Sequence, residues 1–270
     1  MRAEELLHQG DLSGALAELQ QAVRSDPANA KLRIFLFQLL CVVGDWERAL
    51  TQLEVAGELD TLNLAMVQTY REAIRCELFR QRVFNGETSP LIFGDPPEWT
   101  AYLIEALRLT ASGEYAQASE LRARAFELAP ATPGSIDETP FAWIADADAR
   151  LGPMLEIIVN GRYYWVPFQR LTAIDIEPPE DLRDLIWVPA HLTLENQGET
   201  VALIPSRYPG SEQSEDTQLQ LAKKTLWDAP AEGVFLGAGQ RLLTTDIDEY
   251  PLLNTRKIIL QPAASDEQTY

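Results

Sequence analysis

The sequence contains little cysteine and no long apolar run. Its two cysteines, Cys41 and Cys76, are too few to staple a secreted fold, and both fall in strongly helical sequence, so we expect reduced thiols in a core. No run of about 18 or more apolar residues is present, which argues against a membrane span. The segment MRAEELLHQG lacks the basic residues and long apolar stretch of a secretory signal. These absences predict a cytoplasmic protein with no membrane insertion.

Positive charge is also scarce. The chain has 22 Lys and Arg against 41 Asp and Glu, which gives a formal net charge of −19. Phosphate binding needs clustered Lys and Arg, and because no such cluster is visible we expect no nucleic-acid partner. The acidity indicates either an ordinary soluble surface or a preference for a basic partner segment.

Residues able to carry chemistry are few and scattered. His8 and His191 have no metal-ligand spacing to a Cys or a carboxylate, which favours structural roles. Paired acids without a calcium-loop pattern favour caps and turns, and they are Asp146 with Asp148, and Asp246 with Asp248 and Glu249. Residues 233–239 lack the Lys-Ser/Thr of a phosphate loop and favour a turn. We therefore predict a protein that is not an enzyme, with no catalytic residue, metal or cofactor.

The N-terminal half repeats itself with an offset of 34 residues. Gly10-Asp11 recurs as Gly44-Asp45, and Ala15-Leu16 recurs as Ala49-Leu50. A third copy begins at Gly113, and in every copy one Ala lies five residues after the Gly and a second lies twelve after it.

This spacing has a mechanical cause. The Gly ends a helix, where a positive φ is needed, and the two Ala residues share one face of the next helix, so that two helices can approach closely. Pro27 and Pro130 stop the second helix in the first and third copies. The pattern is the tetratricopeptide signature and predicts a helical domain over residues 1–130. Between the second and third copies, residues 61–84 predict one helix within an atypical hairpin that fills the gap.

The C-terminal half changes to the period of strands. A linker and a short helix over residues 141–150 are expected to make residues 131–150 a connection to a β-rich domain over residues 151–270. Two β-rich runs flank Asn160-Gly161, which predicts a hairpin of residues 155–159 and 162–167. Further strands are expected at residues 171–177, 187–194, 200–204, 241–245 and 258–260, a strand or short helix at 223–227, and a glycine-rich turn within 234–240. The predicted class is α+β, with a small antiparallel barrel or a sandwich as open alternatives.

One group of aromatic and basic residues is of the kind that dominates protein-binding surfaces. Its members lie along one predicted strand and at the end of another, and they are Arg162, Tyr163, Trp165, Arg207 and Tyr208. They are candidate partner-binding residues. The alternative is that one face of the strand belongs to the core.

Four segments resemble the signature of a known family. They are Asp148-Ala149-Arg150-Leu151-Gly152-Pro153, Asn160-Gly161-Arg162-Tyr163-Tyr164-Trp165-Val166-Pro167, Arg183-Asp184-Leu185-Ile186-Trp187 and Ile204-Pro205-Ser206-Arg207-Tyr208-Pro209-Gly210-Ser211. Over nearly its whole length the chain resembles the ImpE/SciE/TagJ group, accessory proteins of the bacterial type VI secretion system. The resemblance implies a cytoplasmic role at the contractile sheath, associated with the small sheath subunit and, through it, with the AAA+ ATPase that dismantles contracted sheaths. It implies no catalytic residue.

The leading hypothesis is therefore a non-catalytic adaptor whose helical hairpins offer a concave face to a helix or an extended peptide. By position in the repeat, the residues expected to line that face are Lys31, Ile34, Gln38, Thr100, Leu103 and Leu107. The resemblance points to an amphipathic helix of the sheath subunit as the ligand. One alternative is a small-molecule-binding regulator or enzyme with a pocket lined by Arg162, Trp165 and Arg207. Another is a structural subunit that associates with itself.

Overall fold

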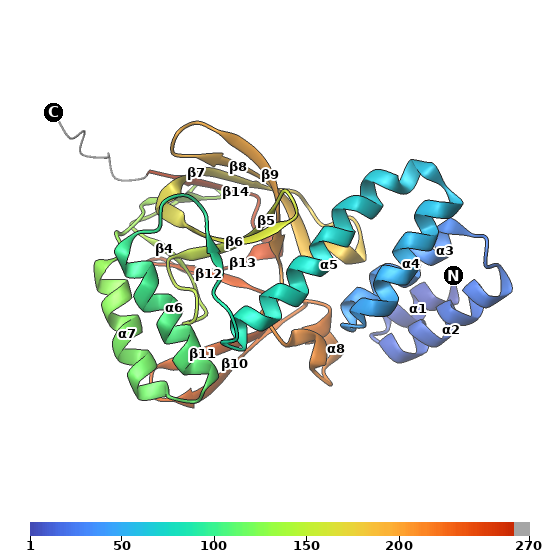
Figure 1. Ribbon diagram of the computed structural model, residues 1–270, viewed down its shortest axis with the longest axis horizontal. Helices are drawn as coiled ribbons and strands as arrows, with labels where there is room; N and C mark the ends of the chain where they lie inside the picture. The colour runs from blue at the N-terminus through green and yellow to red at the C-terminus, as the bar shows by residue number, and fades with distance from the viewer. Residues whose placement is uncertain (262–270) are drawn as a thin grey trace.

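The computed structural model describes residues 1–261 and consists of a helical part and a strand-rich part. Three helical hairpins form the bulk of the first part (Figure 1), with bounds α1 (Arg2–His8) and α2 (Leu12–Ser25), α3 (Ala30–Val42) and α4 (Trp46–Leu59), and α6 (Glu98–Ala111) and α7 (Tyr115–Leu128). Within residues 1–261, none of the helices combines the length and the apolar character needed to cross a bilayer.

The repeat residues have the positions that the tetratricopeptide pattern predicts. Gly10, Gly44 and Gly113 all have a positive φ, between +74° and +81°, at the turn between two helices. The alanines that follow them, Ala15 and Ala49 among others, have no exposed surface. The prediction of tetratricopeptide-type hairpins is confirmed.

The gap between the second and third copies is filled by one long helix. α5 (Leu64–Phe84) follows a 3₁₀ turn at Thr61–Asn63, and the chain then runs through a loop that carries the two-residue strand β1 (Leu91–Ile92). The predicted atypical hairpin is therefore replaced by a single helix. α5 crosses the middle of the molecule, with α1–α4 at one end and α6–α7 at the other (Figure 1).

The strands form one large sheet and two small ones. The remaining bounds are β2 (Gly134–Ile136), β3 (Thr139–Phe141), β4 (Ile144–Asp146), β5 (Met154–Val159), β6 (Arg162–Pro167), β7 (Leu171–Ile176), β8 (Trp187–Leu194), β9 (Glu199–Pro205), α8 (Thr217–Gln220), β10 (Thr225–Ala231), β11 (Val234–Gly239), β12 (Leu242–Thr245), β13 (Glu249–Pro251) and β14 (Lys257–Leu260). The nine-stranded sheet has the order β1-β6-β5-β9-β8-β7-β14-β2-β3, and the small sheets are β13-β12-β4 and β10-β11. The α+β class is confirmed, and the large sheet is not a closed barrel.

Both faces of the large sheet are covered, as its inner strand β5 shows. Leu155, Ile157 and Val159 belong to a core shared with the small sheet that contains Leu243 of β12. Met154 and Ile158 belong to the core that the helices share. Because side chains alternate along a strand, Glu156 points to the same side as Met154 and Ile158, toward α5.

Two local predictions are wrong. Residues 141–150 are not a helix, because β4 and a loop occupy them and the carboxylate of Asp146 accepts a hydrogen bond from the N–H of Asp148 at 2.8 Å. Residues 234–239 are strand β11 rather than a glycine-rich turn. A Cβ at Gly237 would lie 2.3 Å from the Tyr208 ring, so this glycine provides space for a packed ring.

We expect the close approach of the paired helices to depend on small side chains. Replacing Ala49 by Leu would place three extra carbon atoms in a fully buried contact, and should lower the free energy of unfolding by about 1–3 kcal/mol. The matched control is Ala65→Leu on the exposed side of α5, which should change it by less than about 0.5 kcal/mol. Urea unfolding compares the two variants. Equal stability in both would show that Ala49 does not set the helix spacing.

Candidate protein-binding groove

A groove of about 610 Å³ lies where the first two hairpins meet the strand-rich part. We call it the α1–α3 groove. One wall comes from α1 and α3, and the other comes from the segment between β7 and β8. Its lining residues are Met1, Glu4, Leu7, His8, Lys31, Leu32, Ile34, Phe35, Gln38, Pro179, Glu180, Asp181, Leu182 and Leu185. The helical repeat therefore forms only one of the two walls of the groove.

The floor of the groove is mostly apolar because Gln38 is the one polar residue among residues 34–42 of α3. Residues 36–42 of α3 are buried, whereas the side chains of Leu32, Ile34 and Phe35, one turn earlier, remain partly exposed in the groove. Carboxylates of Glu4 and Glu180 stand at the rim together with Lys31. Such a groove suits the apolar face of a helix with polar or basic flanks.

The second wall is held in place by charged side chains. Two backbone N–H groups, those of Glu180 and Asp181, donate to one carboxylate oxygen of Asp184 at 2.8 and 2.9 Å. The Arg183 guanidinium pairs with Asp181 at 2.6 Å and lies 4.8 Å from the centre of the Tyr70 ring on α5. The wall is therefore fixed to the helical part before any ligand binds.

Arg207 holds the far end of α3. Its guanidinium donates to the carbonyl oxygens of Cys41 and Val42 at 3.3 and 2.8 Å, and to that of Gln220 at 2.5 Å. The last carbonyls of a helix lack partners inside the helix and carry its negative dipole end, so a cation stabilises them there. Arg207 thereby joins the strand-rich part to the helix that forms the groove floor.

A cluster of buried charges lies between α5 and the large sheet, and we call it the buried junction. Its centre is Glu156, which accepts two hydrogen bonds from Arg80 of α5, at 2.6 and 3.0 Å, and pairs on its other side with Arg241. Arg80 also pairs with Glu77 at 2.9 Å, and Arg241 also pairs with Asp146. All five side chains are at most 5% exposed.

Aromatic groups complete the hydrogen bonding of these carboxylates. The Tyr163 hydroxyl donates to Glu156, and the Trp165 indole N–H donates to the Tyr163 oxygen at 2.6 Å. The Trp187 indole N–H donates to Glu77 at 3.0 Å, and the Tyr208 hydroxyl donates to Asp146 at 3.0 Å. The junction is thus a connected network in which each carboxylate has several partners.

Glu156 is ionised in this network. Burial opposes its charge, but Arg80 and Arg241 outweigh burial and lower the pKa of its carboxyl to about 2. Burial also raises the pKa of the Tyr163 hydroxyl, with the neighbouring Glu156 charge acting in the same direction, so this hydroxyl stays a donor.

The structure brings together some of the predicted site residues and separates others. Lys31, Ile34 and Gln38 line the α1–α3 groove. Thr100, Leu103 and Leu107 are buried on α6, in a different hairpin. Of the aromatic and basic group only Arg162 is exposed, and the buried members are Tyr163, Trp165, Arg207 and Tyr208.

This burial also bears on the pocket considered for a small molecule. Trp165 and Arg207 use their polar atoms on neighbouring groups inside the protein, and Arg162 lies at the surface. The three side chains therefore do not converge on one cavity. The histidines are both exposed, His8 at the groove and His191 3.6 Å from Glu177.

Sequence reasoning missed the second wall of the groove and the charges behind it. Residues 179–185 begin at the second residue of the pair Pro178-Pro179 and carry no predicted element; the capping pattern of Asp181 and Asp184 is the signal of local order there. Glu77 and Arg80 are three residues apart on a helix, a spacing that is also typical of exposed surface pairs, so the spacing alone does not reveal their burial. Glu156 inside an apolar strand was the one available signal of a buried charge.

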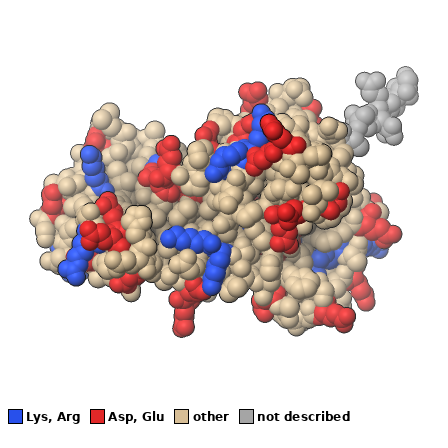
Figure 2. All heavy atoms as spheres, turned by 180° about the vertical axis from the view of Figure 1, so that it is seen from behind, with Lys and Arg blue, Asp and Glu red and all other residues tan. Residues whose placement is uncertain are grey.

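Acidic side chains are spread over both ends of the molecule, as Figure 2 shows for the face opposite that of Figure 1. Together, the hairpins, the groove and the fused strand-rich part define a tetratricopeptide-type protein with a groove of mixed origin. A sequence profile of the ImpE protein family matches residues 138–259, and a tetratricopeptide-repeat profile matches residues 6–72.

The type VI secretion system accessory component TagJ of Pseudomonas aeruginosa is 53% identical to this chain over 262 residues, which are 97% of this chain and 92% of that protein. The chain belongs to the ImpE/TagJ family. A crystal structure of protein VPA1032 from Vibrio parahaemolyticus has the same fold, with a TM-score of 0.88, 26% identity and coverage of 98% of this chain and 99% of that one.

We expect the buried junction to be intolerant of a missing charge. Arg80→Met leaves Glu77 buried without its cation and leaves Glu156 with Arg241 alone, and should lower the free energy of unfolding by about 3–5 kcal/mol. The control is Arg75→Met on the same helix. The Arg75 side chain, which pairs with Glu72, is 61% exposed, so this pair should contribute at most about 1 kcal/mol to the free energy of unfolding. Urea unfolding measures both. A loss no larger for Arg80→Met than for Arg75→Met would contradict the network.

The junction also predicts an acid limit of stability. The pKa of Glu156 is lower in the folded chain than its usual value, so its contribution is complete above about pH 4.5 and is lost as the pH falls toward 2. The loss for this one group is on the order of 3 kcal/mol. Arg80→Met should flatten this part of the curve, because the lowered pKa depends on Arg80. Parallel curves for the two proteins between pH 4.5 and 2 would count against this role of Arg80.

Proposed function

We propose that this chain is a cytoplasmic, non-catalytic adaptor of the type VI secretion system that binds the small sheath subunit and assists its recognition by the sheath-disassembling ATPase. The observation that carries the proposal is the α1–α3 groove, which has an apolar floor on α3 and a preformed second wall. The family assignment supports the secretion-system context, since TagJ is described as an accessory component of that system.

The shape and chemistry of the groove favour an amphipathic helix as ligand. Side chains of Leu7, Ile34 and Leu182 converge from three different segments, as needed to hold an apolar stripe at helical spacing. Glu4 is paired with the amino group of Met1 at 2.6 Å, whereas Glu180 is exposed and, within residues 1–261, pairs with no Lys or Arg, so Glu180 favours Lys or Arg on the flank of that stripe. A helix of the small sheath subunit is the ligand that the family resemblance implies.

The groove is tested by a direct binding measurement. A fluorescein-labelled peptide that covers an amphipathic helix of the small sheath subunit is titrated with the full chain, and binding is followed by fluorescence polarisation. Ile34→Asp places a charge on the apolar floor and should weaken binding by about tenfold or more. The matched control is Leu62→Asp, because Leu62 is 89% exposed and lies outside the groove, and this variant should bind as the native chain does.

Unfolding midpoints of both variants show whether the fold is kept. Unchanged binding by Ile34→Asp would exclude this groove as the docking site. Loss of binding by Leu62→Asp as well as by Ile34→Asp would show that the loss is not specific to the groove.

A further inference from the structure

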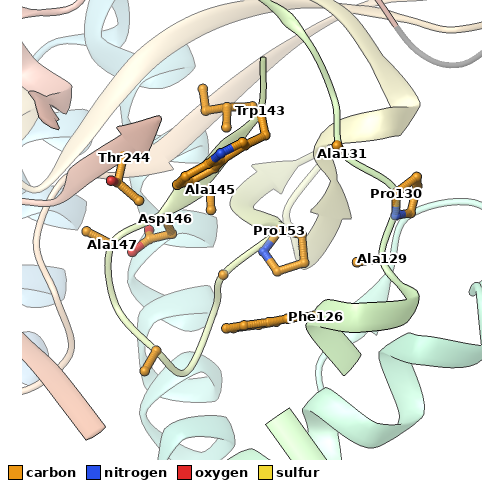
Figure 3. Close-up of a pocket in the computed structure, with 13 residues that line it drawn as sticks. Phe126, Ala129, Pro130, Ala131, Trp143, Ala145, Asp146, Ala147, Pro153 and Thr244 are labelled. Carbon is orange, nitrogen blue, oxygen red and sulfur yellow. The ribbon is translucent and has the colours of Figure 1, made fainter. Parts of the chain in front are cut away.

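A second hollow is lined by residues of α7 and β4. These two elements lie at the opposite end of the molecule from α1 and α3 (Figure 1). The hollow has a volume of about 400 Å³ and lies between the end of α7, the linker after it, β4 and the loop that follows β4 (Figure 3). Its lining is mostly apolar, namely Phe126, Ala129, Pro130, Ala131, Trp143, Ile144, Ala145, Asp146, Ala147, Ala149, Gly152, Pro153 and Thr244. We call it the Phe126–Trp143 pocket. Its size is that of a site for a ligand or a few side chains.

The pocket is preformed. The loop after β4 is closed by a hydrogen bond from the Asp146 N–H to the Gly152 carbonyl at 2.7 Å. Inside that loop, Asp148 accepts from the N–H groups of Arg150 and Gly237 at 2.8 and 2.7 Å. A Cβ at Gly152 would lie 2.3 Å from the Phe126 ring, so the glycine allows the ring to form the wall. A ligand therefore finds the site already ordered, which removes part of the cost of binding.

Large apolar side chains stand at the mouth of the pocket. Phe126 and Trp143 are 40% and 39% exposed, on opposite sides of the hollow (Figure 3). Ile247 is 60% exposed in the next turn along the surface, whose Asp246 accepts a hydrogen bond from the N–H of Ala142, the residue before Trp143, at 2.7 Å. An apolar patch that includes an exposed Trp is typical of protein-binding surfaces.

The turn beside this mouth is strongly acidic. Asp246, Asp248 and Glu249 are all exposed, and within residues 1–261 none of the three pairs with a Lys or Arg. The local charge therefore complements a basic ligand. A second copy of this chain is a poor occupant, because the chain has a net charge of −19 and two such acidic mouths would repel each other. An anionic membrane surface is repelled for the same reason.

We propose that the Phe126–Trp143 pocket is a second protein-docking site, which takes a bulky apolar side chain flanked by Lys or Arg from a partner protein. The site is separate from the α1–α3 groove, so one molecule can hold two protein segments at its two ends. The proposal stands on residues that the groove does not use, and its failure leaves the proposed adaptor function untouched.

The test uses the full chain and three labelled peptides of equal length in fluorescence polarisation. The first has Leu-Trp between pairs of Lys, the second has Glu in place of every Lys, and the third keeps the Lys residues but has Ala-Ala in the centre. The first peptide should bind at least about tenfold more tightly than the other two, because it alone matches both the apolar pocket and the acidic turn. The third peptide separates pocket binding from simple attraction between charges.

Variants locate the binding. Trp143→Ala should weaken binding of the first peptide by about tenfold, and Glu249→Lys should weaken it several-fold and reduce its dependence on salt. Glu249 is exposed at the start of β13, so this variant tests the site even if Trp143→Ala is destabilised. Leu62→Ala, at an exposed residue outside both sites, should bind the first peptide as the native chain does, whereas a loss of binding in Ile34→Asp would place this peptide in the α1–α3 groove instead.

Several results would overturn the proposal. They are absence of binding by the first peptide, equal binding of the first and third peptides, binding unchanged in both Trp143→Ala and Glu249→Lys, and loss of binding in Ile34→Asp. Analytical sedimentation of the native chain tests whether the pocket binds a second copy of the chain. A native dimer that becomes a monomer in Trp143→Ala would assign the pocket to a second copy instead.

Discussion

The arrangement of the whole molecule depends on the pairing of Glu156 with Arg80 and Arg241. Arg80 lies 76 residues before Glu156 and Arg241 lies 85 residues after it, so the three charges join distant parts of the chain. A buried ion pair adds little net stability compared with apolar packing, but a mispaired charge in the same place is costly. The network therefore selects one position of α5 on the large sheet, because other positions would leave a buried charge alone.

The position of α5 in turn fixes the α1–α3 groove. α5 continues from the second hairpin, and its aromatic rings pack against the sheet. The ring centres of Tyr70 and Trp187 are 6.1 Å apart, and those of Phe84 and Trp165 are 6.0 Å apart. Arg207 adds a second attachment at the end of α3. The two walls of the groove come from different halves of the chain, and these attachments fix the distance between the two walls. Ligand binding in the groove would therefore depend on buried residues that the ligand does not touch.

Features set by local sequence could be predicted, and features set by contacts between distant segments could not. The 34-residue period and the Asn160-Gly161 hairpin identified most helices and the strands β5 and β6, since Gly and Asn-Gly act on their own backbone. The requirement for a glycine at position 237 could not be predicted, because it comes from the packed ring of Tyr208, which is distant in sequence.

The candidate site was predictable in part for the same reason. Ile34 was found from its place in the repeat, but the facing wall at residues 179–185 has no sequence relation to the repeat. Tyr163 and Trp165 were candidate surface residues because they alternate along one strand. The same alternation of side chains occurs when a helix covers that face of the strand. Only the long helix α5, which packs on that face, distinguishes the two cases.

Hydrogen–deuterium exchange of the full chain, with and without the small sheath subunit, tests the central claim most directly. The account predicts that binding slows exchange together in α1, in the first turns of α3 and in residues 179–185, because these segments form the walls of one groove. Slower exchange confined to segments outside the α1–α3 groove, or no change on adding saturating subunit, would contradict it.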